Sequence, residues 1–98
     1  MKYTLDRNEN ELTVKVSGRL DTVTSPELEQ KLNSSLEGIK KLIFDFGELS
    51  FISSAGLRVV LGAFQIMKEQ GEMVIRNTCP EVMEVFEVTS FDSDFTFE

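Results

Sequence analysis

Histidine is absent from this chain of 98 residues, and cysteine occurs once, at Cys79. Histidine is the commonest general base, metal ligand and phosphocarrier, so most catalytic mechanisms lose their usual residue. A zinc site needs several cysteine or histidine ligands at close spacing, which a single cysteine cannot supply. One cysteine also rules out an internal disulfide, which favours a reducing cytoplasm as the location.

Long apolar runs and basic residues are also scarce. No stretch approaches the roughly 18 apolar residues of a membrane span, so we expect neither a targeting segment nor direct membrane insertion. Ten basic and 17 acidic side chains give a formal net charge of -7. We therefore expect no nucleic-acid partner, because the phosphates of a nucleic acid require a basic surface. The acidic surplus either serves solubility or steers the chain toward a basic partner surface.

Motifs for nucleotide and metal binding are missing as well. Neither a GxxxxGK[ST] loop nor a GxGxxG turn occurs, so the chain lacks the usual backbone cradle for a nucleotide. Asp92 and Asp94, with Glu98 beyond them, offer carboxylates for a divalent cation, but no glycine-centred calcium loop surrounds them. We therefore expect a solvated acidic surface there, with no metal and no other cofactor.

Cys79 precedes Pro80 at the start of a short predicted helix. A phosphocysteine carrier is conceivable at such a position, but the carrier thiol usually sits in a loop of backbone amides, and no glycine is present here to shape one. We expect a buried or idle thiol, with Thr78 as the cap of the helix.

The N-terminal third predicts a hairpin followed by a helix. Alternation of Leu12, Val14 and Val16 with polar residues indicates a strand with one buried face, ended by Gly18. Residues 3–6 are its expected hairpin partner, joined by a turn over 7–10. A helix is expected to start at the capping Ser25 with Pro26 and Glu27, and to stop at Gly38, with leucines at helical spacing between them: Leu28, Leu32 and Leu36.

The rest of the chain alternates strands and helices. Residues 42–46 are almost continuously apolar, which is typical of a central parallel strand that is covered on both faces. A helical stripe runs from Leu57 to Gln70 and ends at Gly71, before a strand over 73–75. A short helix from Pro80 and a strand over 95–97 complete the pattern.

This order predicts one α/β domain over residues 1–98. Short links between alternating strands and helices favour parallel neighbours and right-handed crossovers. We expect a mostly parallel mixed sheet with an N-terminal antiparallel hairpin strand, and helices packed on the sheet. The chain stops just after its last predicted strand, which leaves that sheet edge available for contacts in a homodimer.

The segment from Phe46 to Leu57 is the candidate site. It joins the most hydrophobic strand to the strongest helix, and ligands of open α/β sheets bind where such turns follow the strands. Ser53 and Ser54 stand where the first free N–H groups of the helix point outward, so a phosphoryl group there would be stabilised. Either serine could instead simply cap the helix. Gly56 suggests the close approach of another backbone.

The residues 51–57, Phe-Ile-Ser-Ser-Ala-Gly-Leu, follow an Asp45-Phe46 strand end and resemble the signature of STAS domains, in particular anti-sigma factor antagonists. Gly18-Arg19-Leu20-Asp21 resembles the Gly-x-Leu-Asp turn of that family, and the resemblance extends over essentially the whole chain. It implies a non-catalytic cytoplasmic protein that binds an anti-sigma factor serine kinase and releases the sigma factor. Phosphorylation of a serine abolishes binding, and a separate serine phosphatase restores it.

Matched by position, the resemblance assigns the phosphorylated serine to Ser54, the motif glycine to Gly56 and the loop aspartate to Asp21. Many antagonists carry aspartate before the switch serine, whereas this chain has Ser53, which makes Ser53 a fallback acceptor. The surface expected to bind the partner comprises these residues: Asp21, Thr22, Ser53, Ser54, Ala55, Gly56, Leu57 and Arg58.

Two other functions stay open at this point. A STAS accessory subunit of a membrane transporter would use the same helix start to dock on a partner without phosphorylation. A small serine hydrolase would require a general base that the chain does not visibly provide.

Overall fold

The strands form one five-stranded sheet in the order β1-β2-β3-β4-β5. The computed structural model describes residues 1–89 and 95–98. β1 pairs antiparallel with β2, and the following pairs are all parallel. The predicted fold class is thus confirmed. The elements are β1 (Lys2–Asn8), β2 (Glu11–Leu20), α1 (Ser25–Asn33), β3 (Lys41–Ile52), α2 (Ser54–Gln70), β4 (Glu72–Arg76), α3 (Pro80–Val88) and β5 (Thr96–Phe97).

The hairpin of β1 and β2 is tighter than the sequence predicts. Asn8 already pairs with Glu11, so only Glu9 and Asn10 form the turn, and Glu9 adopts a positive φ of 58°. β2 also continues through Gly18 to Leu20 instead of ending at the glycine. This extra length brings the end of β2 next to the end of β3, where the candidate site lies.

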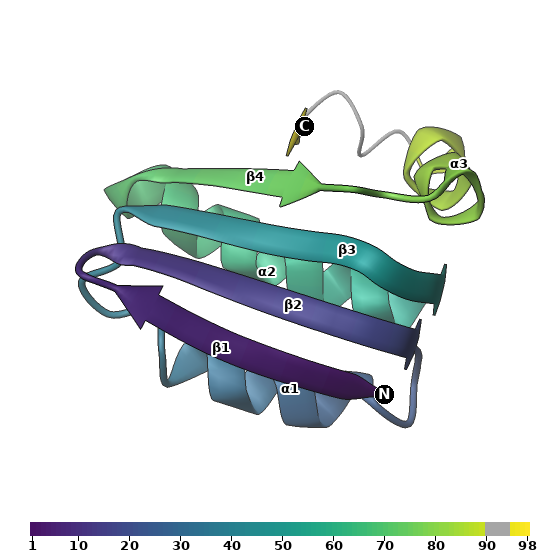
Figure 1. Ribbon diagram of the computed structural model, residues 1–98, viewed down its shortest axis with the longest axis horizontal. Coiled ribbons are helices and arrows are strands. Elements are labelled where there is room, and N and C mark those ends of the chain that lie inside the picture. The colour runs from purple at the N-terminus through teal and green to yellow at the C-terminus, as the bar shows by residue number, and fades with distance from the viewer. Residues whose placement is uncertain (90–94) are drawn as a thin grey trace.

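α1 and α2 form a helical layer on one face of the sheet, and α3 lies beyond the end of β4 (Figure 1). Each helix connects two neighbouring parallel strands, as expected for βαβ units. β3 is the middle strand, as predicted. Ile43 points away from the helical layer by alternation and is nevertheless buried, so the predicted burial of both faces holds, although α1 and α2 share a single face.

The hydrophobic core fills the space between this face and the helices. Apolar side chains alternate along β2 and recur at helical spacing along α1 and α2. Burial of these groups is the main favourable contribution to folding. The largest fully buried side chains are Phe44, Phe46, Phe86, Leu12, Leu20, Leu28, Leu32, Ile39, Leu42, Ile43, Leu49 and Ile52.

β3 is much longer than the predicted strand over 42–46. It pairs with β4 only as far as Asp45, and two register shifts against β2 accommodate the residues that follow. Beyond Asp45, β4 no longer pairs with β3, and α3 lies against that side of β3 instead. There the Cys79 thiol donates a hydrogen bond to the Leu49 carbonyl at 3.4 Å. Ile52 therefore ends a strand, and the expected loop to α2 shrinks to Ser53 alone.

The start and the end of α1 differ from the sequence prediction. Thr24, not Ser25, is the N-cap, and the Thr24 side chain makes no capping hydrogen bond to the helix. Ser25 is the first helical residue, and its buried hydroxyl has no partner within the described part of the chain. The helix ends at Asn33, before the predicted stop at Gly38. The hydroxyls of Ser34 and Ser35 donate hydrogen bonds to the Lys31 carbonyl at this end.

The start of α3 and the end of α2 lie closer to the positions that the sequence predicts. Cys79 rather than Thr78 is the N-cap of α3, while Pro80 occupies the predicted first position. Gly71 caps the C-terminus of α2 as predicted.

Among the described residues, no helix combines the length and the apolar character that a membrane crossing requires.

Candidate functional site

The N-terminus of α2 begins immediately after β3, with two serines in different roles. Ser53 is the N-cap, and its Oγ accepts a hydrogen bond from the Gly56 N–H at 3.4 Å. The Ser53 N–H donates to the Leu20 carbonyl at 2.9 Å, which ties the start of α2 to the end of β2. Ser54 is the first helical residue and its side chain is exposed. The two roles considered for this serine pair, helix cap and accessible hydroxyl, thus belong to different residues: Ser53 caps, and Ser54 is accessible.

The electrostatic surroundings of Ser54 favour an anion. The N–H groups of Ser54 and Ala55 belong to the first turn, where an α-helix provides no acceptor. No acidic residue occupies the first turn of α2, so the positive end of the helix dipole has no carboxylate beside it in that turn. A phosphoryl group on Ser54 would be added at this positive end.

Gly56 packs the start of α2 against the end of β2. A Cβ atom at this position would lie 2.7 Å from Cγ1 of Ile52 and 2.8 Å from the Leu20 carbonyl oxygen. Any side chain would push α2 away from the sheet, because real Cβ contacts are longer. The close approach that the sequence suggests is therefore confirmed, and it sets the position of the neighbouring serines.

Asp21 organises the loop between β2 and α1. Its Oδ1 accepts hydrogen bonds from the backbone N–H groups of Val23 at 3.0 Å and Thr24 at 3.1 Å. The bond from the Thr24 N–H is the largest cause that holds the pKa of Asp21 below its ordinary value, and Arg19 adds to the shift. Arg19 Nε lies 3.8 Å from Oδ2. The carboxylate thus holds the loop in one shape beside the start of α2.

The starts of α1 and α2 enclose a shallow hollow of about 210 Å³. The residues that line it are Thr22, Ser25, Pro26, Glu29, Ala55, Arg58 and Val59. Two exposed apolar side chains lie near the C-terminal ends of β2 and β3: Val23 in the loop after β2 is 86% exposed, and Phe51 in β3 is 37% exposed. The guanidinium of Arg19 lies over the Phe51 ring at 4.1 Å. The exposed Ser54 hydroxyl, the hollow and the exposed Val23 lie around the starts of α1 and α2 and form a surface suited to protein contact. Phe51 alternates with the buried Ile52 and therefore points to the opposite face of the sheet.

A protein-family model of the STAS domain matches residues 2–98. The chain belongs to the STAS domain family. The resemblance noted in the sequence is thereby confirmed over almost all of its length.

This STAS domain is similar in sequence to two named relatives and in structure to one solved protein. BtrV of Bordetella bronchiseptica, named as a candidate anti-sigma factor antagonist, is 39% identical over 97 residues, which cover 97% of this chain and 84% of BtrV. The anti-sigma-B factor antagonist of Bacillus subtilis is 30% identical over 84 residues, covering 85% and 77%. The crystal structure of an anti-sigma factor antagonist from Mycobacterium paratuberculosis has a TM-score of 0.87 at 24% identity and covers 98% of this chain and 83% of that one. This last likeness shows the fold.

The structure brings most of the expected contact residues of this STAS domain together. Thr22, Ala55 and Arg58 line the hollow, and Asp21 and Ser53 organise the loop and the cap on its border. Gly56 is buried, and Leu57 is 3% exposed in the core. Direct contact of Gly56 and Leu57 with a partner is therefore not expected, because α2 turns both toward the interior.

Sequence reasoning missed Val23 and Phe51 as exposed apolar groups and Arg19 as the cationic neighbour of Phe51. A valine between two threonines in a loop is a usable signal, since an apolar side chain there has no periodic strand or helix face to join. Phe51 has no comparable signal, because its exposure depends on the unpredicted extension of β3.

The sequence offered two further candidate sites, an acidic cluster and Cys79. Over residues 1–89 and 95–98, no group of three or more cysteine or acidic side chains could hold a metal ion. Asp92 and Asp94, which the sequence offered as cation ligands, lie outside the described residues. Cys79 is half-buried at the start of α3, with its thiol against the Leu49 carbonyl.

Proposed function

We propose that this STAS domain is an anti-sigma factor antagonist that binds an anti-sigma factor serine kinase and thereby frees the sigma factor. Phosphorylation of Ser54 switches this binding off, and a serine phosphatase restores it. The names of the relatives in Bacillus subtilis and Bordetella bronchiseptica support the class of function. The observation that carries the proposal is the exposed Ser54 at the first position of α2, beside a different serine that acts as the cap.

Ser54 is the proposed acceptor in preference to Ser53. The Ser53 oxygen already accepts the Gly56 N–H, and its residue is only half-exposed. A kinase that used Ser53 would have to displace this capping bond, which contributes about 1 kcal/mol to helix stability. The hydroxyl of Ser54 has no such role in the described hydrogen bonds.

The chemistry of the switch belongs to the partners. The kinase transfers the γ-phosphoryl group of ATP to Ser54 Oγ, with loss of the hydroxyl proton and release of ADP. The phosphatase hydrolyses the phosphate ester with water and returns the free hydroxyl and inorganic phosphate. On this proposal the domain is a substrate and contributes no catalytic group.

The effect of the modification is local. Phosphorylation adds about -1.5 to -2 charges to the contact surface, which repels acidic groups of the partner and blocks close packing. The N-terminus of α2 stabilises the added charge, so the fold is kept. The proposed contact surface is formed by Thr22, Val23, Ser54, Ala55 and Arg58, with Asp21 as a positioning residue.

The proposed location is the cytoplasm, where sigma factors and their regulators meet RNA polymerase.

The test of the proposed function uses protein isolated from its own cells, with intact mass measurement and peptide mapping of the wild type and of Ser54→Ala. We expect one phosphoryl group on Ser54 that disappears in the variant, and binding of an anti-sigma factor kinase of the same organism to the unphosphorylated form. Absence of phosphate under growth and stress, with copurification of a membrane transporter, would contradict the proposal and favour an accessory subunit.

A further inference from the structure

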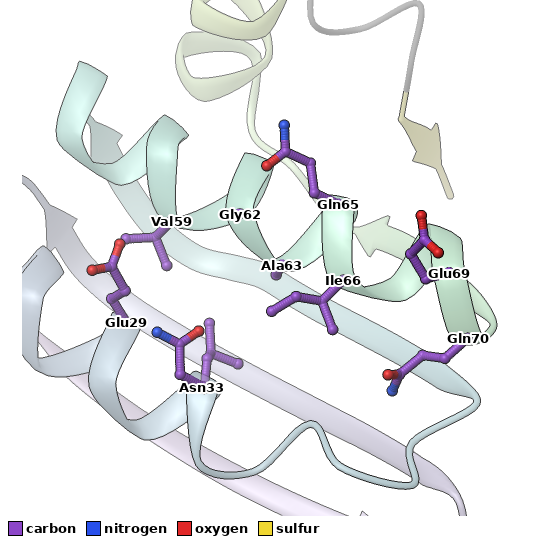
Figure 2. A pocket seen from close by; sticks show the side chains of 10 residues that line it. Glu29, Asn33, Val59, Gly62, Ala63, Gln65, Ile66, Glu69 and Gln70 are labelled. Atoms are coloured by element: carbon purple, nitrogen blue, oxygen red, sulfur yellow. The ribbon is translucent and has the colours of Figure 1, made fainter.

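A groove runs between α1 and α2 on the solvent side of the helical layer. Its volume is about 670 Å³, against about 210 Å³ for the hollow beside the start of α2. Figure 2 shows Asn33 of α1 across from Ala63 and Ile66 of α2. The floor is apolar, with Leu32, Val59 and Ala63 buried, while Ile66 remains 37% exposed. Apart from Ile66, these apolar side chains are already covered by the chain itself, so what the groove offers to an apolar group is the Ile66 side chain and the open space beside Gly62.

Gly62 lies in the middle of α2 and lines this groove. A Cβ atom there would meet no atom within 4 Å, and the residue does not need a positive φ. By contrast, a Cβ atom at Gly56 or Gly71 would collide with neighbouring atoms. Glycine is the least favourable ordinary residue in a helix interior apart from proline, so the described fold gives no reason for it at position 62. The missing side chain keeps the groove open.

The rim of the groove carries negative charge. Glu29 of α1 and Glu69 of α2 are both exposed lining residues, and the ten residues that line the groove include no lysine or arginine. A segment that fills the groove gains from Lys or Arg side chains toward these two carboxylates. A second copy of this chain would instead place acid against acid, because a two-fold interface brings the same patch together.

One end of the groove is closed and the other leads to the switch. The Gln70 side-chain amide donates hydrogen bonds to the carbonyls of Leu36 and Ile39, both at 2.7 Å, and so ties the loop after α1 to the end of α2. At the opposite end, Glu29 and Val59 line both the groove and the hollow beside the start of α2. The two depressions therefore form a continuous surface that starts near Ser54.

From these observations we infer that the groove is a second part of the partner surface. It receives a segment of the anti-sigma factor that places an apolar side chain over Gly62 and basic side chains beside Glu29 and Glu69. This inference rests on the proposed function, whose switch it extends along α2. Contact in the groove supplies affinity, while Ser54 at its open end controls whether the partner can dock.

The first test fills the groove. Gly62→Trp introduces a large side chain into open space, and Gly62→Ala adds one methyl group that meets no neighbour within the chain, so the two variants fill the groove to different degrees. The probe is the purified anti-sigma factor kinase of the same organism that binds the wild-type domain. We expect Gly62→Trp to weaken binding at least about tenfold and Gly62→Ala to weaken it by a smaller factor, since loss of close packing at an interface core is costly and grows with the volume added. Circular dichroism and urea unfolding verify that both variants fold.

The second test reverses charge. Glu29→Lys and Glu69→Lys are each expected to weaken binding about fivefold at low salt, with a smaller effect at high salt. Glu87→Lys on the exposed side of α3 changes the net charge equally but lies outside the groove, so it serves as the control. Equal weakening by all three variants would point to overall charge and overturn the inference.

The outcomes separate the two proposals. If Ser54→Asp abolishes binding while Gly62→Trp and Glu69→Lys bind like the wild type, the groove is not part of the interface and only the inference fails. If no anti-sigma factor kinase of the organism binds the wild-type domain, the proposed function fails and the inference falls with it. Loss of a wild-type dimer in Gly62→Trp, measured by sedimentation, would assign the groove to a second copy and overturn the inference.

Discussion

The start of α2 differs from the starts of α1 and α3. Both α1 and α3 have proline in the first helical positions and glutamate in the first turn, Glu27 and Glu81, and neither N-cap side chain makes a capping hydrogen bond. α2 has the reverse arrangement: the Ser53 hydroxyl caps it, and no acidic residue follows in the first turn. Two helices thus carry a fixed negative charge at their positive ends, and the third carries none.

This difference explains why a phosphoryl group suits Ser54. A carboxylate in the first turn stabilises a helix by complementing its dipole. In α1 and α3 this charge is permanent, whereas phosphorylation would supply it to α2 reversibly. The modified helix would resemble its two neighbours in charge, so the proposed switch requires no rearrangement of the fold.

The largest expected effect comes from breaking the close packing at the start of α2. Gly56→Ala forces a methyl group to within 2.7 Å of Ile52, and we expect the free energy of unfolding to fall by about 2 kcal/mol. Gly62→Ala in the same helix has open space and should raise it by up to about 1 kcal/mol. Urea unfolding of both variants measures the contrast, and a stabilised Gly56→Ala would show that the packing is looser than described.

A smaller effect separates the two serines. Ser53→Ala removes the capping oxygen and should lower the free energy of unfolding by about 1 kcal/mol. Ser54→Ala should change it by less than about 0.5 kcal/mol, because the exposed hydroxyl has no structural role. Thermal and urea unfolding provide the values. Equal losses in both variants would contradict the division of roles between cap and acceptor.

Adding an acid to α2 sharpens the comparison of the helix starts. Ser54→Asp should raise the free energy of unfolding by about 0.5 kcal/mol at low salt, and Glu27→Gln and Glu81→Gln should each lower it by a similar amount. All three differences should shrink in 1 M salt, where charges are screened. A loss of stability in Ser54→Asp would mean that the N-terminus of α2 does not favour negative charge.

The smallest effect concerns acid pH and the loop before α1. Because the pKa of Asp21 is held below its ordinary value of 3.8, its carboxylate stabilises the folded state above that pH. This contribution is lost as the pH falls through the lower folded pKa. We expect Asp21→Asn to be slightly less stable than the wild type at pH 7, and the gap to close on acidification toward pH 2. A gap that is independent of pH would argue against the bonds from Val23 and Thr24 to the carboxylate.

The order of elements could be predicted because each has its own local signal. Alternation in β2, the helical stripe of α2 and the stop at Gly71 are short-range patterns, and they led directly to the fold class. The end of β3 at Ile52 was missed, because Gly47-Glu48 reads as a turn when the register shifts against β2 are unknown. The cap of α1 was missed because serine is the better capping residue by type, whereas the fold places Ser25 inside the helix and buries it.

The site was predictable in part for a related reason. Ser53 and Ser54 precede a helical stripe, so a helix start at this serine pair follows from the sequence. Which serine caps depends on the one-residue link from β3, which the sequence does not show. The groove depends on the packing of α1 against α2, and only Gly62 hinted at it, as an unfavourable residue in a helical run.

α3 has a consequence for colloidal behaviour. Since β4 leaves β3 after Asp45, the last residues of the central strand would present unpaired backbone groups to other molecules if nothing covered them. Such an exposed edge is a template for strand addition and aggregation. α3 lies beside this stretch, and the Cys79 thiol bonds to its Leu49 carbonyl. The short helix therefore protects the solubility of the domain, independently of any partner that binds at the start of α2.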